Sequence, residues 1–251
     1  MHRSALSIPH ATQLIQDLAT QLSALDALQL SPDSLEEVRL LQIRRLARRI
    51  ETIIPGHFGH GERTAHYALL LAKRLGLSRS QCLDLHYSAL LHDIGLLMLP
   101  GHLLGTPAPH TLNDYALIQS HPREGGALLS PYAFLQEAAR LIAHHHERWD
   151  GAGYPYGLRG EYIPVPARIL AIADVFDSIA SRTKSRDSAL RTLRASAGSQ
   201  FDPTFCLTFC ELLHNHDHHK PHHVSTVANT PLYSEQAAEP SANAHMTPSG
   251  I

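Results

Sequence analysis

Five histidines and two aspartates recur along the chain, with successive positions or adjacent pairs separated by 24 to 32 residues. Imidazole nitrogens and carboxylate oxygens together suit divalent first-row metals such as iron or manganese. Two aspartate charges against two dications leave a net positive charge, which favours an anionic substrate. A two-metal site lowers the pKa of a bridging water and holds a phosphoryl oxygen, so this set predicts a metal-dependent phosphohydrolase. The candidate ligands are His60, His92, Asp93, His121, His145, His146 and Asp174.

The stretch from His144 to Pro155 joins a run of histidines to a loop that contains several glycines. We expect the preceding helix to continue through His145 and His146, and the Asp-Gly and Gly-Tyr-Pro sequences to end it with turns. One interpretation of the loop is a helix stop with an aromatic lid over the core. We favour the other interpretation, in which Tyr154 shapes a pocket for guanine or phosphate or faces a partner, because the loop directly follows the candidate ligands.

Helical periodicity predicts the elements that must position these side chains. Leucines at steps of three and four indicate an amphipathic helix within residues 1–30, and Ser31-Pro32 is typical of the start of a second helix. Further helices are expected at 58–75, 78–95, 111–121, 134–146 and from Pro164 through Ile179, followed by two helices that Asp187 and Asp202 open. No segment shows convincing strand alternation. We therefore expect an all-α fold, a helical bundle with a buried dinuclear metal site.

The composition limits the classes of function. Apolar residues make up 43% of the 251 residues and the formal net charge is −2, so no global charge points to nucleic acid. The three cysteines form no disulfide framework, and no apolar run reaches the roughly 18 residues that a membrane span needs. We therefore expect a cytoplasmic protein that binds neither membrane nor DNA.

The C-terminal segment differs in composition from the rest. Seven of the 20 histidines fall within the last 38 residues, where helical periodicity is lost and polar residues prevail. We expect 215–251 to be a disordered, histidine-rich tail without a specific metal site. The predicted organisation is an N-terminal amphipathic helix at 1–30, a phosphohydrolase domain at 31–214 and this tail.

Several short motifs at this spacing together resemble the HD-GYP family, a branch of the HD phosphohydrolases. They are His60, His92-Asp93-Ile94-Gly95, His121-Pro122, His145-His146-Glu147, Gly153-Tyr154-Pro155 and Ala173-Asp174-Val175-Phe176-Asp177. The resemblance implies that the domain is an HD/PDEase-like helical bundle with a di- or trinuclear metal centre. It also implies hydrolysis of the bacterial second messenger cyclic di-GMP to the linear dinucleotide or to GMP, in signal transduction. The family's ligands map onto the seven candidates above, with Asp93 bridging two ions as the catalytic residue.

The chain departs from the family pattern at residues that would contact phosphate. Leu96 stands where members usually have a lysine, and Thr183 stands in place of the first arginine of an Arg-Pro-Tyr-Arg run. Lys184 and Arg186 are the candidates to compensate, as substrate-binding residues alongside Tyr154. Lysine does not reproduce the bidentate binding of an arginine, so we expect this compensation to be incomplete.

Gly56 marks a further departure, which concerns the number of metals. Members with a third metal have a glutamate at this position, four residues before His60. The expected cofactors are therefore two divalent ions, iron or manganese. Among the remaining histidines, His57 is the best candidate for a substitute ligand.

Two main functions remain open, and a metal-bound oxygen-sensing role is a third alternative. The first is a cyclic di-GMP phosphodiesterase or a close relative that acts on another phosphate ester. The second is a catalytically weak or inactive member that keeps the metals and acts by binding nucleotide or a partner protein such as a diguanylate cyclase. Leu96 and Thr183 support the second, because the loss of a desolvated charged contact costs on the order of 2–5 kcal/mol. In either case we expect a homodimer through the leucine stripe of the N-terminal helices.

Overall fold

The computed structural model describes residues 8–104 and 111–218, and over these ranges the chain is helical. The described residues form no β-strand, although an isolated bridge joins Ala197 to Phe201. The predicted all-α fold is therefore confirmed. The α-helices are α1 (Ile8–Asp26), α2 (Pro32–Glu51), α3 (His60–Arg74), α4 (Arg79–Leu91), α5 (Leu112–Ile118), α6 (His121–Leu129), α7 (Gln136–Ala143), α8 (Val165–Thr183), α9 (Arg186–Ala195) and α10 (Pro203–His218). The short 3₁₀ helices are η1 (Ile94–Met98), η2 (Gly101–Leu103), η3 (Ala133–Leu135) and η4 (Gly160–Tyr162).

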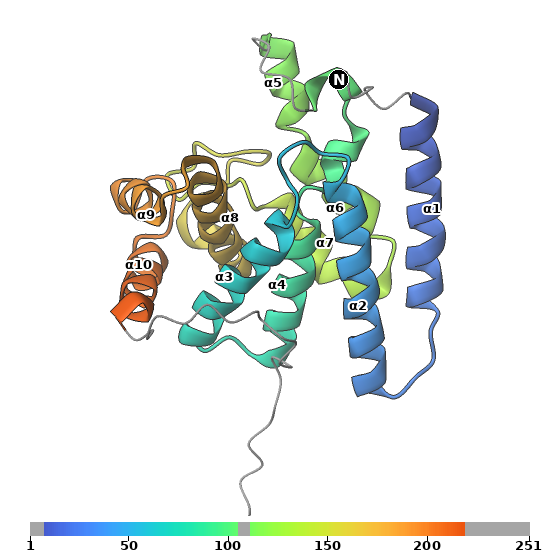
Figure 1. Cartoon of the computed structure of the whole chain (residues 1–251), viewed down its shortest axis with the longest axis horizontal. Helices are drawn as coiled ribbons and strands as arrows, with labels where there is room; N and C mark the ends of the chain where they lie inside the picture. The colour runs from blue at the N-terminus through green and yellow to red at the C-terminus, as the bar shows by residue number, and fades with distance from the viewer. Residues whose placement is uncertain (1–7, 105–110, 219–251) are drawn as a thin grey trace, which may run out of the picture.

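The centre of the fold is formed by α3, α4, α7 and α8, with α1 and α2 on one side and α9 and α10 on the other (Figure 1). α3 packs against both α4 and α8, and α6 packs against α7 and η1. Leu71, Leu85, Ile142 and Phe176 come from these central helices and are fully buried. Burying each such side chain stabilises the fold by about 1.5–3 kcal/mol. This core fixes the helix ends at which most of the candidate ligands lie.

The N-terminal helices pack on the same core. Ser31 caps α2 by accepting a hydrogen bond from Ser34 N, and the adjacent proline occupies the first turn, as predicted. Leu18, Leu22 and Leu25 of α1 are buried within the chain's own hydrophobic core. The inward leucine stripe predicted to form a homodimer is therefore already covered, and a dimer through these helices would have to use other residues.

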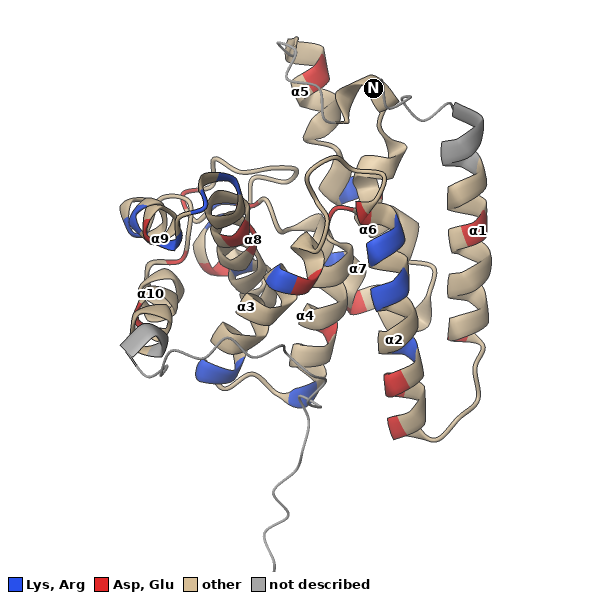
Figure 2. Cartoon of the chain, in the orientation of Figure 1, with Lys and Arg blue, Asp and Glu red and all other residues tan. Residues whose placement is uncertain are grey.

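Charged residues are distributed along α2 according to the helix dipole. Asp33 lies in the first turn and Arg48 and Arg49 lie in the last, and in Figure 2 the red segments at the start of α2 are followed by blue ones, although the final residue, Glu51, is acidic again. Acidic groups near a helix N-terminus and basic groups near its C-terminus are each favourable by about 0.3–1 kcal/mol at exposed sites. The dipole accounts for Arg48 and Arg49, and Arg44 and Arg48 also lie 3.6 and 3.7 Å from Glu62 of α3, so these arginines have favourable partners within the chain.

The boundary between α5 and α6 differs from the prediction. The helix expected to end at His121-Pro122 ends at Ile118, and His121 is instead the first residue of α6. Proline lacks the backbone N–H that a helix interior requires, but the N–H groups of the first turn have no acceptor within the helix, so proline loses no hydrogen bond there. Pro122 therefore begins a helix where it was interpreted as a terminator.

The helix that leads to the histidine run is shorter than predicted. α7 ends at Ala143, and His144, His145 and His146 form a turn. The backbone N–H groups of His144 and His145 donate to carbonyls three residues back, at 3.1 and 3.4 Å. The last two of these histidines thus reach the centre from a turn and do not continue the helical period.

The C-terminal boundary is also placed differently. α10 ends at His218, beyond the predicted end of the domain at His214, and the rest of the predicted tail, 219–251, lies outside the described residues. Over the part of the chain that the structure describes, no helix combines the length and the apolar character that crossing a bilayer requires.

Candidate metal centre

The seven predicted ligands meet at one place in the fold. Two groups of three have their ligand atoms within 4.8 Å of one another: His60, His92 and Asp93, and His121, His145 and His146. One carboxylate oxygen of Asp93 lies 3.1 Å from His92 Nε2, and the other lies 3.6 Å from His121 Nε2. The side chain of Asp93 therefore faces both groups at once.

Asp174 adds a second carboxylate to the first group. Its Oδ1 lies 3.1 Å from His60 Nε2 and 3.7 Å from His92 Nε2, and the residue is buried in the middle of α8. Burial raises the pKa of this carboxyl, but hydrogen bonding to His60 and the charges of nearby imidazoles outweigh burial and hold the pKa below its ordinary value. Asp174 is therefore an anion at neutral pH.

Helix boundaries place most of the ligand side chains. His60 is the first residue of α3 and His121 is the first residue of α6. His92 is the C-cap of α4, and the next residue, Asp93, immediately precedes η1. Because the chain changes direction at these ends, the side chains of two adjacent residues can face the same centre.

Three of the histidines are fixed by the same local hydrogen bond. The Nδ1 atoms of His92, His121 and His145 lie 3.0, 2.7 and 2.6 Å from the carbonyl oxygen three residues earlier in the chain. A carbonyl oxygen only accepts, so Nδ1 carries the hydrogen. When each ring is neutral, as a metal ligand must be, Nε2 therefore turns its unshared electron pair toward the centre.

The second group fits a metal ion. The Nε2 atoms of His121 and His145 lie 3.4 Å apart, and two unshared pairs that face each other at this distance repel unless a cation lies between them. Burial lowers the pKa of both rings, and burial also lowers that of His146 to about 4. Three imidazoles that are neutral at pH 7, with a carboxylate oxygen of Asp93, form a donor set suited to a divalent first-row ion.

His60 is hydrogen-bonded at both ring nitrogens. Its Nδ1 lies 2.7 Å from Asp177 Oδ2, and its Nε2 lies 3.1 Å from Asp174 Oδ1. Burial lowers the pKa of His60, but hydrogen bonds to Asp174 and Asp177 and the charges of Asp174 and Asp93 outweigh burial and raise it to about 10. Without a metal the ring is therefore an imidazolium between carboxylates, and ligation would require loss of the Nε2 proton.

The sequence did not identify Asp177 and Arg63 as residues of the site. Arg63 donates from Nε and from a terminal nitrogen to the two oxygens of Asp177, at 2.8 and 3.0 Å. Burial raises the pKa of Asp177, but hydrogen bonds to His60 and Arg63 outweigh burial and lower it. The available signal was the position of Asp177 three residues after Asp174, which places both carboxylates on one face of α8.

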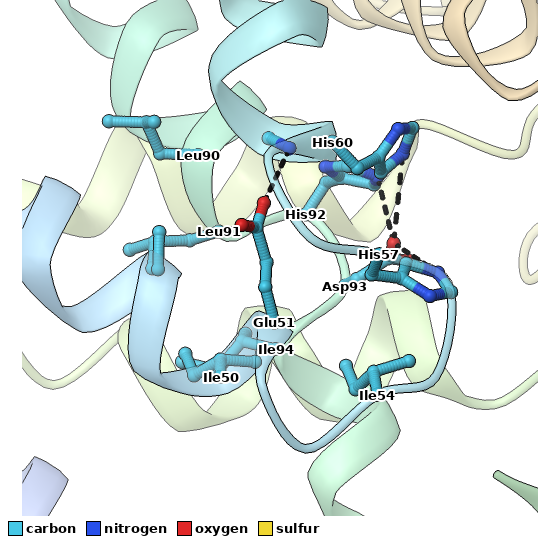
Figure 3. Close-up of a pocket in the computed structure, with 12 residues that line it drawn as sticks. Ile50, Glu51, Ile54, His57, His60, Leu90, Leu91, His92, Asp93 and Ile94 are labelled. Atoms are coloured by element: carbon cyan, nitrogen blue, oxygen red, sulfur yellow. Dashed lines mark hydrogen bonds and ion pairs between the residues drawn. The ribbon is translucent and has the colours of Figure 1, made fainter. Parts of the chain in front are cut away.

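Glu51, at the end of α2, was also missed. Its two carboxylate oxygens accept hydrogen bonds from the backbone N–H groups of Gly59 and Gly61, each at 2.7 Å, and Figure 3 shows the side chain reaching toward the start of α3. A Cβ at Gly61 would lie 3.2 Å from Glu51 Oε1, so glycine permits this approach. Glu51 thus fixes the first turn of α3 and the position of His60. A single glutamate at a helix end gives no sequence signal for this role.

Tyr154 lies over the candidate ligand His146, with ring centroids 4.9 Å apart and 36° between the planes. Its backbone N–H donates to His146 O at 3.2 Å, and a Cβ at Gly153 would lie only 2.6 Å from that oxygen, so the loop requires glycine there. Burial, followed by the charges of Asp174 and Asp93, raises the pKa of Tyr154 to about 12. The structure therefore places a protonated phenol beside the second group.

Glu147 fixes the glycine loop that carries Tyr154 through two hydrogen bonds. Its carboxylate oxygens accept hydrogen bonds from Tyr156 N at 2.7 Å and from Leu158 N at 2.9 Å, and the residue is buried. Two backbone N–H groups of the loop are thereby satisfied by one side chain. Glu147 appears in the motif that carries the family resemblance, but its role was not predicted.

The positions that depart from the family pattern are occupied as follows. Leu96 is partly buried against the hydrophobic core, and Thr183 is exposed at the end of α8, where its hydroxyl donates to a carbonyl one turn earlier at 2.8 Å. Lys184 is the exposed C-cap of α8, with φ of 55°. Arg186 donates to a backbone carbonyl of α10 at 2.8 Å. Substrate binding by Lys184 and Arg186 stays a prediction.

The chain is similar to several known proteins. The HD domain family matches residues 44–205. The cyclic di-GMP phosphodiesterase response regulator RpfG of Xanthomonas campestris is 41% identical over 180 residues, which are 69% of this chain and 48% of that protein. The 3'3'-cGAMP-specific phosphodiesterase 2 of Vibrio cholerae is 33% identical over 168 residues, which are 64% of this chain and 32% of that protein. The chain thus spans about half or less of the length of these curated relatives.

The fold is also similar to a solved structure. Bd1817, an HDG"Y"P protein from Bdellovibrio bacteriovorus, superposes with a TM-score of 0.57 over 85% of this chain and 75% of that one, at 18% identity. At this identity the likeness concerns the fold alone. The family match, by contrast, spans the positions of all seven candidate ligands. The chain therefore belongs to the HD domain family, and its resemblance to the HD-GYP branch, predicted from its motifs, is confirmed.

Proposed function

We propose that this chain is a metal-dependent phosphodiesterase that hydrolyses cyclic di-GMP in bacterial second-messenger signalling. The observation that carries the proposal is the position of Asp93, whose two oxygens face two groups of histidine ring nitrogens. Two neighbouring donor groups joined by one carboxylate suit two divalent ions with Asp93 as the bridging ligand. The relatives named as phosphodiesterases for cyclic di-GMP and for 3'3'-cGAMP support the same class of reaction.

The expected cofactors are two divalent ions, iron or manganese, because imidazoles and carboxylates contribute together. The first ion would be held by His60, His92, Asp93 and Asp174, and the second by Asp93, His121, His145 and His146. When bound, such ions lower the pKa of water and stabilise charge on a phosphoryl oxygen. The buried carbonyl-bonded imidazoles hold their donor atoms in place before any ion or substrate arrives.

Residues outside the ligand set would bind the substrate. The phenol of Tyr154 is protonated at neutral pH and lies against His146, so it offers a hydrogen-bond donor or a stacking surface for guanine beside the second group. Lys184 is ten residues after Asp174, and at 1.5 Å per residue of helix the two lie about 15 Å apart along α8. Lys184 and Arg186 would therefore contact a part of the dinucleotide remote from the ions.

A weak or inactive member that binds nucleotide or a partner protein is the second candidate. It is favoured by the structure around Leu96 and Thr183, since the first packs against the core and the second bonds within its own helix end. Neither side chain supplies a cation to a phosphate. The partner proposed for this case is a diguanylate cyclase. A homodimer and a cyclic dinucleotide ligand are expected in both cases, as is a cytoplasmic location.

The test is anaerobic incubation of iron- or manganese-loaded protein with cyclic di-GMP and, separately, with 3'3'-cGAMP, with products separated by chromatography. We expect linear dinucleotide or mononucleotide from the wild type and none from His92→Ala. His102→Ala, which changes an exposed histidine of η2, should retain activity. Absence of product from wild-type protein that holds two ions would contradict the phosphodiesterase and favour the binding function.

A further inference from the structure

His57 lies beside the first group although it is not one of the seven predicted ligands. It occupies the loop 52–59 between α2 and α3, and its Nε2 lies 3.3 Å from Asp93 Oδ2 (Figure 3). Its ring meets that of His60 edge-on, with centroids 5.6 Å apart. The side chain is 32% exposed, so one part of the ring is open to solvent while the nitrogen faces the centre.

The loop holds His57 in this position through its backbone. His57 N donates to Ile54 O at 3.2 Å, and His57 O accepts from His60 N at 2.8 Å. Gly56 and Gly59 have φ of 83° and 73°, in the left-handed region that glycine adopts without strain. The imidazole is therefore carried by a turn with defined hydrogen bonds, one residue after Gly56.

The Nδ1 atom of His57 lies against a backbone carbonyl oxygen, as the Nδ1 atoms of the predicted ligands His92 and His121 do. Its Nδ1 lies 3.1 Å from Pro55 O, and a carbonyl oxygen only accepts, so Nδ1 carries the hydrogen. In the neutral ring Nε2 then has an unshared pair directed at Asp93. The rings of His92 and His121 have the same arrangement, with Nδ1 on a carbonyl and Nε2 toward an Asp93 oxygen.

Two imidazoles converge on one carboxylate oxygen. His57 Nε2 and His92 Nε2 lie 3.3 and 3.1 Å from Asp93 Oδ2, and both rings already donate through Nδ1. A single proton at this point satisfies only one of the two nitrogens and leaves the other facing an anion with an unshared pair. A metal ion can bind both nitrogens and the carboxylate oxygen together, because one cation accepts electron pairs from several ligand atoms at once.

We propose that His57 is a further protein ligand of the metal centre, which binds a divalent first-row ion together with His92 and Asp93. The inference rests on the proposed metal centre and adds an eighth residue to it. A further neutral imidazole makes the ligand set richer in nitrogen, which favours iron, cobalt or zinc over manganese or magnesium. Because His57 is partly exposed, it is also the ligand most accessible to exchange with solvent.

The first experiment measures cobalt affinity by competition with a chelator, in wild-type protein and in His57→Gln. We expect two ions per wild-type chain, and in His57→Gln one ion bound at least about tenfold more weakly. The matched control is His144→Gln. His144 neighbours a predicted ligand, but its Nδ1 lies 2.6 Å from Arg140 O and its ring stacks on Tyr156, so both affinities should stay unchanged.

A second variant distinguishes a ligand from a residue that only supports the loop. In cobalt-loaded His57→Cys we expect a new thiolate-to-cobalt charge-transfer absorption in the near ultraviolet, because such a band requires sulfur bonded to the metal. The three native cysteines are buried, and the wild-type spectrum supplies their baseline. Unchanged affinity in His57→Gln together with no new band in His57→Cys would overturn the role of His57 while leaving the phosphodiesterase intact. A wild-type protein that binds no ion would overturn both.

Discussion

His60 Nδ1 lies 2.7 Å from Asp177 Oδ2, and this hydrogen bond leaves Nε2 of the same ring directed at Asp174 and the metal centre. Arg63 binds both oxygens of Asp177, so the carboxylate cannot rotate away without breaking an ion pair. A carboxylate behind a ligating histidine fixes its tautomer and raises its basicity. We therefore expect Asp177 to be a positioning residue that acts on the candidate metal centre through His60.

We expect Asp177→Asn to weaken binding of the ion in the first group by about 10–100-fold. The neutral amide is a weaker acceptor for His60, and it no longer pairs with Arg63. Chelator competition measures the affinity, and Asp187→Asn, at an exposed carboxylate of α9, is the control. If Asp177→Asn bound metal as the wild type does, His60 would keep its tautomer without the carboxylate.

We expect Gly95→Ala to destabilise the fold by more than about 3 kcal/mol and to reduce metal content. A Cβ at Gly95 would overlap His121 O and lie 2.7 Å from Gly125 N, both of which are backbone atoms of α6. η1 would have to move away from α6, and Asp93 would separate from His121. Chemical denaturation and metal analysis test this expectation. A variant with normal stability and two ions per chain would contradict this expectation, because η1 could then move away from α6 without displacing the candidate ligands.

We expect Glu147→Gln to destabilise the chain by about 1–3 kcal/mol and to loosen the glycine loop. The amide of glutamine offers one accepting oxygen, so it cannot satisfy both Tyr156 N and Leu158 N. Trp149 is the single tryptophan and lies in this loop, so its fluorescence reports loop order while denaturation reports stability. Unchanged fluorescence and stability would mean that water replaces the lost acceptor.

We expect the double variant Leu96→Lys with Thr183→Arg to hydrolyse cyclic di-GMP faster than the wild type. The two changes restore the cations that the family pattern has at these positions, and each desolvated charged contact contributes on the order of 2–5 kcal/mol. Turnover by metal-loaded protein is the measurement, and metal content is measured alongside because Leu96 packs against the core. No gain at equal metal content would mean that the missing cations do not limit turnover.

We expect stability to fall as the pH drops from 6.5 toward 3, because of His86. This buried ring lies 3.5 Å from Arg44, and burial followed by the charge of Arg44 lowers its pKa from 6.5 to about 3. Below pH 6.5 the unfolded chain binds a proton that the folded chain does not, so stability is lost at up to about 1.4 kcal/mol per pH unit. Urea denaturation at pH 7 and pH 5 should show a smaller loss in His86→Leu. Equal losses in the two proteins would assign the pH dependence to other groups.

The sequence singled out residues that the fold brings together, because most of them combine a metal-binding residue type with a helix boundary or a core-facing stripe; their role as ligands stays a prediction. His60, His92 and Asp174 could be placed in this way without knowing which helices touch. The sequence did not predict Asp177 and Arg63 as partners, since they lie 114 positions apart and meet only through the packing of α3 on α8. The partner of a ligand is a tertiary property, whereas the ligand itself has a local signature.

Local signals are ambiguous where one residue type serves two purposes. Proline ends helices and begins them, and Pro122 was assigned to the wrong one of these roles. Arginine near a helix end binds phosphate or backbone carbonyls with the same donors. Arg186 donates to a carbonyl of α10, a neighbour that the sequence gave no reason to place beside it.

The ligand groups have a consequence for folding. His60 and Asp174 are 114 positions apart, and residues from α3, α4, α6, the turn after α7 and α8 converge between them. An ion held by such distant residues closes long loops and restricts the unfolded chain in the manner of a cross-link. At a free ion concentration 100 times its Kd, one bound ion adds about 2.7 kcal/mol to stability. Metal availability in the cell would then set how long the folded chain survives proteolysis as well as whether it is active.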